Sequence, residues 1–297
     1  MKPSGSNSNC LNIFSKGWNF SQDGPGNRLL YHLQGCNFCC PWCSNPEGIS
    51  LQGTLLFYPD KIRDEVCPKG SIRNKQLDRN LCRTCTSREC IGKNRNEGIK
   101  LSMTSYSITE LLREIESAKG LFHSGGGVTI TGGEPTLQLD AVKKLLQELK
   151  TRNIHTTIET NGTSARLTEL FDWLDLLIID LKHHDTTIHK KVLGVGNEQT
   201  IANVRAAVEA DIAVWLRVPL IPDFNNSKKD MIAFMQLFRE IDGKNLAVEL
   251  LPYHEYGKVK WEQIGEPYRM SGKTISPVQI QEYKQLFTDN NIKYINT

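Results

Sequence analysis

From residue 104 onward, short apolar runs alternate with longer amphipathic segments along this chain of 297 residues. Alternation of this kind is typical of βα units, in which each strand of a parallel sheet is followed by a helix that packs over it. The predicted strands are 28–34, 128–131, 154–159, 176–179, 213–218 and 246–251. Six strands are too few for a closed eight-unit barrel, so we predict an α/β fold built as an open, partial (β/α)6 barrel.

The predicted helices follow from apolar residues repeated at helical spacing. After the strand 128–131, one helical face collects Leu137, Ala141, Val142, Leu145, Leu146 and Leu149. Further helices are predicted around 201–210, 230–241 and 278–289. The strand 176–179 is a continuous apolar run, which indicates a strand covered on both of its faces.

Composition excludes several classes of function. The apolar content of 39% supports a substantial core, and the formal charge of +3 is too small to indicate nucleic acid as a partner. No apolar stretch approaches the ~18 residues of a membrane span, and residues 1–9 lack the pattern of a signal peptide. We therefore expect a cytoplasmic protein, whose nine cysteines are better explained by metal ligation than by disulfides.

Polar residues gather where the predicted strands end. Glu134, Glu159, Asp180, Arg217 and His254 each lie at or just past the carboxyl end of a strand. In parallel α/β folds the carboxyl ends of the strands form the rim at which ligands bind. Any one of these residues alone would be read as a cap or a surface residue, but five on one rim indicate a binding site.

A cysteine motif follows the first predicted strand. Cys36, Cys40 and Cys43 have C-x3-C-x2-C spacing, which brings three thiolates together and leaves a fourth coordination position open. Structural metal sites are normally closed by four protein ligands, whereas a site that performs chemistry keeps one position open. Two alternatives remain: a zinc site completed by a distant ligand, and a shifted set in which Cys39 replaces Cys40. Cys10 is expected to be a plain thiol.

Residues 54–102 interrupt the βα pattern and read as an inserted module, which divides the chain into 1–53, 54–102 and 103–297. The module contains Cys67 followed by Pro68, and then Cys82, Cys85 and Cys90. In two-cluster ferredoxins the Cys-Pro of one run completes the cluster that is held by three cysteines of the other run. We therefore predict one auxiliary [4Fe-4S] cluster in a ferredoxin-like insertion, with a structural four-cysteine zinc knot as the alternative.

The same module is basic. Residues 61–100 hold eleven Lys or Arg against five Asp or Glu, a local balance of +6. A solvated basic surface explains this charge, and a docking patch for an acidic protein is the alternative.

Taken together, these motifs resemble the activating enzymes of glycyl radical enzymes, a family of the radical S-adenosylmethionine (SAM) superfamily. The chain is similar to the pyruvate formate-lyase activating enzymes over nearly its full length outside the insertion. The stretches that carry the resemblance are 23–26, 36–47, 124–129, 131–134, 159–162, 180–182 and 251–258.

This resemblance implies that Cys36, Cys40 and Cys43 hold a [4Fe-4S] cluster whose fourth iron is chelated by SAM. The residues implied to bind or flank SAM are Trp42, Cys43, Ser44, Gly132, Gly133, Glu134, Glu159, Asp180, Leu181, Lys182, Arg217 and His254. Lys182 suits the carboxylate of SAM by its charge, and the two glycines would leave room for the cofactor. In the pyruvate formate-lyase activating enzymes, the pair at the positions of Glu159 and Asp180 holds a monovalent cation. The first residue of that pair is Asp there and Glu159 here.

The implied reaction is reductive cleavage of SAM to a 5′-deoxyadenosyl radical, which abstracts hydrogen from a glycine of a partner enzyme. The implied partners are a glycyl radical enzyme as protein substrate and a flavodoxin or ferredoxin as electron donor. Two other functions remain open: a radical SAM enzyme with a different substrate, and a zinc-binding interaction protein in which both cysteine groups are structural.

Overall fold

The computed structural model describes residues 8–62, 67–83, 85, 87–93, 98–241 and 243–296. Within these ranges the main sheet has nine strands in the order β13-β12-β11-β10-β9-β8-β2-β1-β7. Their bounds are β1 (Cys10–Phe20), β2 (Asn27–Leu33), β7 (Thr104–Ser107), β8 (Gly127–Gly132), β9 (His155–Thr160), β10 (Leu176–Asp180), β11 (Ala213–Leu220), β12 (Leu246–Pro252) and β13 (Tyr294–Ile295). All neighbours from β2 to β13 are parallel, whereas β1 is antiparallel to β2 and β7. The predicted α/β fold and its six strands are confirmed.

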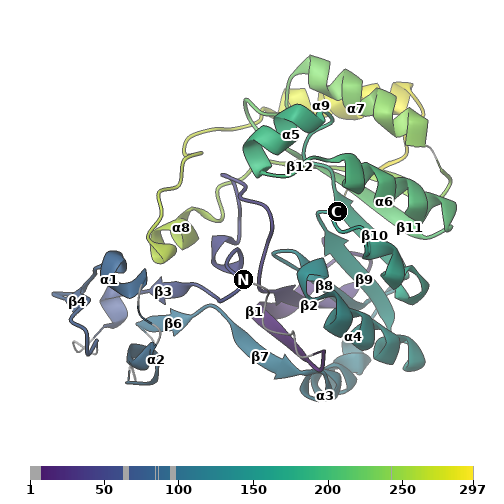
Figure 1. The fold of residues 1–297 in the computed structure, drawn as a ribbon. Coiled ribbons are helices and arrows are strands. Elements are labelled where there is room, and N and C mark those ends of the chain that lie inside the picture. The colour runs from purple at the N-terminus through teal and green to yellow at the C-terminus, as the bar shows by residue number, and fades with distance from the viewer. Residues whose placement is uncertain are drawn as a thin grey trace.

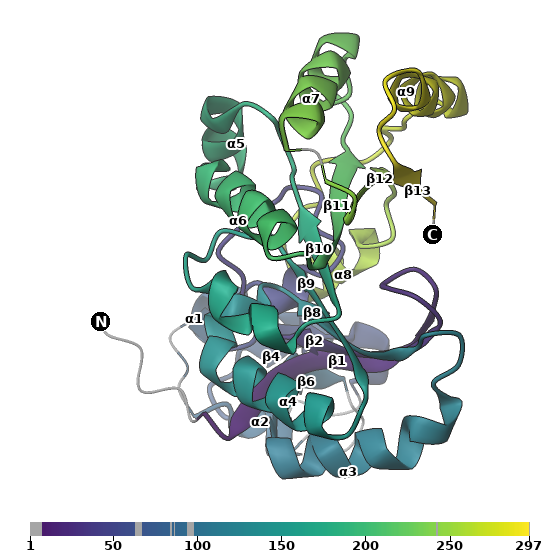
Figure 2. The same ribbon diagram turned by 90° about the vertical axis from the view of Figure 1, so that its right-hand side faces the viewer.

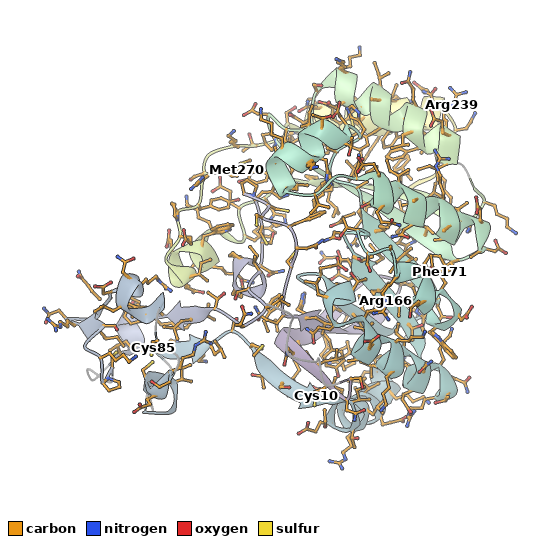
Figure 3. The ribbon with its side chains drawn as sticks, viewed as in Figure 1. Cys10, Cys85, Arg166, Phe171, Arg239 and Met270 are labelled. Carbon is orange, nitrogen blue, oxygen red and sulfur yellow. The ribbon has the colours of Figure 1, made fainter. Side chains whose placement is uncertain are left out.

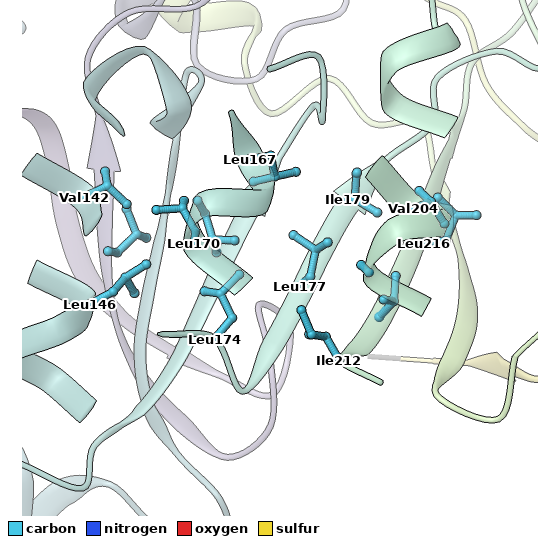
Figure 4. Packing of buried hydrophobic residues seen from close by; sticks show 14 of the residues in the cluster. Val142, Leu146, Leu167, Leu170, Leu174, Leu177, Ile179, Val204, Ile212 and Leu216 are labelled. Carbon is cyan, nitrogen blue, oxygen red and sulfur yellow. The ribbon is translucent and has the colours of Figure 1, made fainter. Parts of the chain in front are cut away.

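The helices that follow these strands cover one face of the sheet, and the insertion projects from the opposite side (Figures 1 and 2). They are α3 (Ile108–Ala118), α4 (Leu139–Thr151), α5 (Thr186–Leu193), α6 (Glu198–Glu209), α7 (Lys228–Ile241) and α9 (Pro277–Asp289), while α8 (Lys258–Ile264) lies on the side of the insertion. Figure 4 shows Val142 of α4 and Val204 of α6 on either side of Leu177 of β10. All three side chains are at most 1% exposed, so the interface between helices and sheet excludes water.

Three differences from the predicted elements have physical causes. The strand β1 precedes the predicted first strand, and it escaped prediction because its second half is largely exposed and carries no apolar period. The edge strands β7 and β13 are too short for a pattern to show. Leu137 does not share the buried face of α4, because Pro135 opens a 3-10 turn, η4 (Pro135–Gln138), and leaves Leu137 39% exposed.

A buried arginine joins three of the parallel strands at their amino-terminal ends. Arg28 of β2 donates hydrogen bonds to the hydroxyls of Thr129 at 2.6 Å and Thr157 at 2.8 Å, and to the carbonyl of Val128 at 2.8 Å. Because its side chain is fully buried, losing these acceptors would leave an unpaired charge in the core. The amino-terminal end of the sheet is therefore fixed, and the opposite rim is free to form a site.

The insertion folds around a small core of its own. Its strands are β3 (Leu55–Phe57) paired with β6 (Ile99–Leu101), and β4 (Ile72–Arg73) paired with β5 (Gln76–Leu77), with helices α1 (Arg79–Arg83) and α2 (Glu89–Lys93). Its buried side chains are Phe57, Ile62, Ile72, Cys90 and Ile99. Figure 3 labels Cys85 in this module, away from the main sheet. The division of the chain at residues 53 and 102 stays a prediction.

Of the helices in the described ranges, none combines the length and the apolar character needed to cross a bilayer.

Candidate active site

A cavity of about 810 Å³ opens at the carboxyl ends of the parallel strands, between the rim and the loop that carries the first cysteine motif. Most of the residues that the sequence assigned to the site line this cavity. They are Cys36, Cys40, Trp42, Cys43, Ser44, Gly132, Gly133, Glu159, Asp180, Lys182, Arg217 and His254. The structure thus brings together the cysteine motif and the strand ends, which lie far apart in the sequence.

The loop after β2 is closed at its base and filled with apolar side chains. Backbone amides of Gly35 and Cys36 donate to the carbonyls of Gly48 at 2.7 Å and Ile49 at 2.9 Å. Above this closure, one apolar cluster contains Phe38, Cys40, Trp42, Leu193, Ile221 and Met270. The packing holds Cys36, Cys40 and Cys43 toward the cavity, whereas Cys39 is exposed and outside the lining. This placement favours the predicted set over the shifted one.

The surroundings of the three thiols hold them in the neutral form until a metal binds. Burial raises the pKa of Cys36 to about 12, and burial also raises the pKa of Cys40 and of Cys43. The charge of Lys182 opposes the rise at all three thiols. A thiol must lose its proton to bind iron, so these side chains need the positive charge of a metal centre in order to ionise.

Among the described residues, one compact set of His, Cys, Asp and Glu ligand atoms lies within 4.8 Å, and it consists of His183, His184 and Asp230.

That compact set does not itself suit a metal. His183 accepts a hydrogen bond from the amide of Asp185 at Nδ1, so its Nε2 carries the proton that points to the carbonyl of Phe224 at 3.1 Å. Both ring nitrogens are therefore engaged with the backbone. The His183 ring braces the turn after β10 instead.

Two of the predicted cofactor residues do not reach the cavity. Leu181 is fully buried in the main apolar core, because it alternates with Asp180 and Lys182 along the chain and points to the other face. Glu134 is fully buried below the rim, where its carboxylate accepts from the amides of Thr136 at 2.9 Å and Asn161 at 2.8 Å. These side chains support the ends of the strands and do not line the cavity.

An ionic network of Arg217 forms the floor of the cavity. The register places Arg217 of β11 beside Asp180 of β10 and Glu249 of β12. Its guanidinium donates to Glu249 and to Glu159 at 2.6 Å each, and it lies 3.3 Å from Asp23. Burial raises the pKa of Glu159, and the charge of Arg217 opposes this rise.

Acceptors and donors remain available above this floor. Lys182 Nζ lies 2.7 Å from Oδ2 of Asp180, and Oδ1 of Asp180 is buried without a hydrogen-bond partner in the described part of the chain. A buried oxygen in this state calls for a ligand that donates a hydrogen bond. A ligand with an ammonium or hydroxyl group and a carboxylate fits this pair of side chains, with Lys182 facing the carboxylate.

Backbone packing explains why Gly132 and Gly133 at the rim are glycines. A Cβ at Gly132, where φ is +131°, or at Gly133 would collide with the backbone of Leu33 and Gly35. Both glycines line the cavity, but strand packing alone already excludes a side chain there. The prediction that they make room for a cofactor is therefore not needed to explain them.

At the mouth of the cavity, aromatic rings cover the outer edge. His254 stacks on Tyr256 with ring centroids 4.1 Å apart, and the Tyr256 side chain is 83% exposed. Burial lowers the pKa of His254, so its ring is neutral near pH 7. A neutral imidazole can accept or donate one hydrogen bond to a ligand in the cavity.

Sequence reasoning missed several residues of the site. Asp23 and His32 line the cavity, as does Lys260, whose Nζ lies 2.8 Å from Oε1 of Glu47. Asp23 stands in the matched stretch 23–26, which was a usable signal. Lys260 and Glu47 meet only in the tertiary structure, so no local pattern could have paired them.

The four cysteines of the insertion lie near one another. Burial raises the pKa of Cys90, and the neighbouring Cys67, Cys82 and Cys85 raise it further by charge repulsion. Hydrogen bonds, including one from the amide of Ser71, lower the pKa of Cys67 although burial alone would raise it. Four sulfurs in one small module match the number of thiolates that one iron-sulfur cluster or one structural zinc ion takes.

Comparison with known proteins identifies relatives of this chain. A model of the radical SAM superfamily matches residues 30–235. The chain is 34% identical to a 4-hydroxyphenylacetate decarboxylase activating enzyme of Clostridioides difficile, over 91% of this chain and 90% of that protein. It is 31% identical to a (2S)-3-sulfopropanediol dehydratase activating enzyme of Klebsiella oxytoca, over 90% and 89%. The structure of Streptococcus suis SuiB bound to its precursor peptide SuiA shares the fold, with a TM-score of 0.54 at 15% identity, covering 89% of this chain and 47% of that chain.

Proposed function

Because the chain belongs to the radical SAM superfamily and, within it, to the activating enzymes of glycyl radical enzymes, we propose that it installs a glycyl radical in a partner enzyme. The observation that carries this proposal is the meeting of three cysteine thiols with Asp180 and Lys182 in one cavity. Three thiols fit a [4Fe-4S] cluster with one iron open, and the acid and base fit the polar groups of SAM.

The cluster and SAM supply the radical chemistry when they are bound. When bound, the cluster supplies one electron that splits SAM into methionine and a 5′-deoxyadenosyl radical, and this radical takes a hydrogen atom from the Cα of a glycine in the partner. The residues of the chain bind, orient and shield the reacting groups.

Each side chain has a role that its surroundings support. Cys36, Cys40 and Cys43 would hold three irons of the cluster, and Lys182 would pair with the carboxylate of SAM. The unpartnered oxygen of Asp180 would accept a hydrogen bond from SAM, and the ring of His254 would contact it from the lining of the cavity.

The remaining residues position these groups. Arg217 holds Glu159 and Glu249 in place, so the floor stays charged but fixed. The guanidinium already pairs with Glu159, which weakens the case for a monovalent cation between Glu159 and Asp180. The ring of Trp42 packs on Phe224 with ring centroids 4.8 Å apart. Trp42 and Ser44 line the cavity, where they would flank the cofactor and help to exclude water from it.

We propose that Cys67, Cys82, Cys85 and Cys90 hold an auxiliary [4Fe-4S] cluster that receives electrons from a flavodoxin or ferredoxin. The basic balance of +6 over residues 61–100 suits an acidic reductant. Replacing Cys82 and Cys85 with Ala should then reduce SAM cleavage more with flavodoxin than with dithionite. Equal loss with both reductants would contradict a relay.

The partner and the location are proposals of the same kind. The substrate is a glycyl radical enzyme, and neither nucleic acid nor a membrane is proposed as a partner of a chain with a formal charge of +3. Because metal-bound thiolates and a radical product need a reducing setting, we place the protein in the cytoplasm.

The direct test is anaerobic incubation of the reconstituted protein with SAM, a reductant and a partner. The partners named by the relatives, 4-hydroxyphenylacetate decarboxylase and (2S)-3-sulfopropanediol dehydratase, are suitable first choices. Electron paramagnetic resonance should detect a glycine-centred radical with at least one glycyl radical enzyme. Formation of deoxyadenosine without such a radical on any partner would favour the alternative, a radical SAM enzyme with a different substrate.

A further inference from the structure

The short helix α8 touches both cysteine regions, and it does so through different residues. It lies against η1 (Pro46–Gly48) of the cavity loop and against β3 of the insertion. Among the described elements it therefore connects two parts of the chain that are separate in sequence and carry separate thiol groups.

Side chains from the first four residues of α8 form hydrogen bonds to the loop of the first cysteine motif. Trp261 Nε1 donates to the carbonyl of Cys43 at 2.9 Å, and Lys260 Nζ donates to Oδ1 of Asn45 at 2.6 Å. Gly257, just before the helix, lies so close that a Cβ there would come within 2.7 Å of the Cys43 carbonyl and of Ser44 Cα. The backbone that follows the third thiol is thus pressed against α8 with no space to move toward it.

At its carboxyl-terminal end, α8 is bonded to the insertion. Arg79 of α1 donates from Nη2 to the carbonyl of Gln263 at 2.6 Å and from Nη1 to the carbonyl of Leu55 at 3.1 Å. Gly265 ends the helix in the left-handed region at φ 78°, and a Cβ there would collide with the Arg79 side chain. Charge-assisted hydrogen bonds from one guanidinium to two backbone carbonyls stabilise the position of a module with so small a core.

The same arginine is next to the thiols of the insertion. Arg79 begins α1, and Cys82 lies three residues later on the same helix. Arg79 therefore ties the helix that carries Cys82 to the end of α8.

We propose that α8 is a clamp through which the insertion fixes the loop of the first cysteine motif, with Arg79 and Trp261 as its two positioning residues. The hydrogen bonds of this clamp run from Arg79 of the insertion to Gln263, and from Trp261 to Cys43. The auxiliary module then acts on the SAM site mechanically, whatever part it takes in electron transfer. This inference rests on the proposed function only in treating Cys43 as a ligand of the SAM cluster.

The test is hydrogen–deuterium exchange of the iron-loaded full chain, followed over residues 43–49. Arg79→Ala should raise exchange there about tenfold, the factor expected when a charge-assisted hydrogen bond is lost. Arg73→Ala is the matched control, because it removes the same charge from an exposed position on β4. Equal exchange in the two variants would overturn the proposal.

A second variant covers the case in which Arg79→Ala simply loosens the insertion. Trp261→Phe keeps an aromatic ring near Tyr268 but loses the bond to the Cys43 carbonyl. It should raise exchange over residues 43–49 while residues 72–82 of the insertion keep their wild-type rates. Wild-type rates over residues 43–49 in this variant would refute the clamp. The readout does not depend on activity, so a protein that fails to cleave SAM could still support or refute it.

Discussion

The three thiols of the cavity and the four thiols of the insertion stand in different surroundings. The cavity thiols pack in an apolar cluster beside the rim of a nine-stranded sheet, and burial raises the pKa of each. The insertion thiols sit in a module whose core has five buried side chains, one of them Cys90 itself. We therefore expect the walls of the first site to stand without a cofactor, and the insertion to depend more strongly on the metal centre proposed for it.

The largest effect should come from the choice of the second cysteine in the cavity motif. Cys40→Ala should reduce deoxyadenosine formation by several orders of magnitude, because the cluster loses one of its three ligands. Chromatography of the products and iron analysis measure this loss. Cys39→Ala is the matched control and should keep wild-type activity, since Cys39 is exposed outside the cavity. The reverse result would show that the shifted set binds the metal.

The walls of the cavity can be tested without any cofactor. Arg217→Ala should lower the free energy of unfolding of the apoprotein by about 3–5 kcal/mol, because Glu159 and Glu249 are left as buried charges. Denaturant titration measures this loss. Arg205→Ala breaks an exposed pair with Glu240 and should cost less than ~1 kcal/mol. Similar losses in both variants would mean that the floor of the cavity is not built by its ionic network.

The insertion should respond to metal where the sheet does not. Removing iron with a chelator should speed trypsin cleavage after Arg73 and Lys75, in the turn between β4 and β5, by about tenfold, the effect of ~1.4 kcal/mol on local opening. Mass spectrometry of the fragments locates the cuts. Cleavage sites in α4 and α6 should be unaffected by the same treatment. An insertion that resists trypsin equally with and without iron would remove the contrast between the regions.

The smallest expected effect is a pH dependence in the sheet far from both thiol groups. Burial alone would raise the pKa of Asp175, but the hydrogen bonds from Lys150 at 2.6 Å and from the amide of Thr156 at 2.8 Å lower it. A lowered carboxyl pKa adds stability above the unfolded value of about 3.9, and this stability is lost as pH falls through the folded value.

Asp175→Asn should therefore cost about 1 kcal/mol at pH 7 and progressively less as the pH falls below about 4. Unfolding curves at several pH values measure the difference from the wild type. The exposed Asp172 provides the control, and Asp172→Asn should change the free energy of unfolding little across the same pH values. A loss in Asp175→Asn that is constant with pH would contradict the assigned charge.

The sequence predicted the parts of the molecule that carry a strong local period. Leu177 and Ile179 stand in a continuous apolar run, and the strand 176–179 appears as β10. The strand β1 was missed because its exposed half has no period, and the seven residues of α8 are too few to show one.

Residues of the candidate site could be predicted from the sequence only where the residue type itself indicates its chemistry. Cys36, Asp180 and Lys182 line the cavity as the sequence indicated. The pairing of Arg217 with Glu249 depends on the register of two strands, and Lys260 with Glu47 depends on how α8 packs; neither has a local signal. For Leu181, alternation along the chain would have predicted a side chain in the core, and its part in binding SAM stays a prediction.

The central claim is that three thiolates leave one iron open for SAM. The most direct measurement is electron paramagnetic resonance of the reduced, reconstituted Cys67→Ala Cys82→Ala Cys85→Ala Cys90→Ala variant, in which only the cavity site can hold iron. We predict about four irons per chain and a cluster signal that changes when SAM is added. Bound zinc in place of iron, or a signal that is identical with and without SAM, would contradict the account.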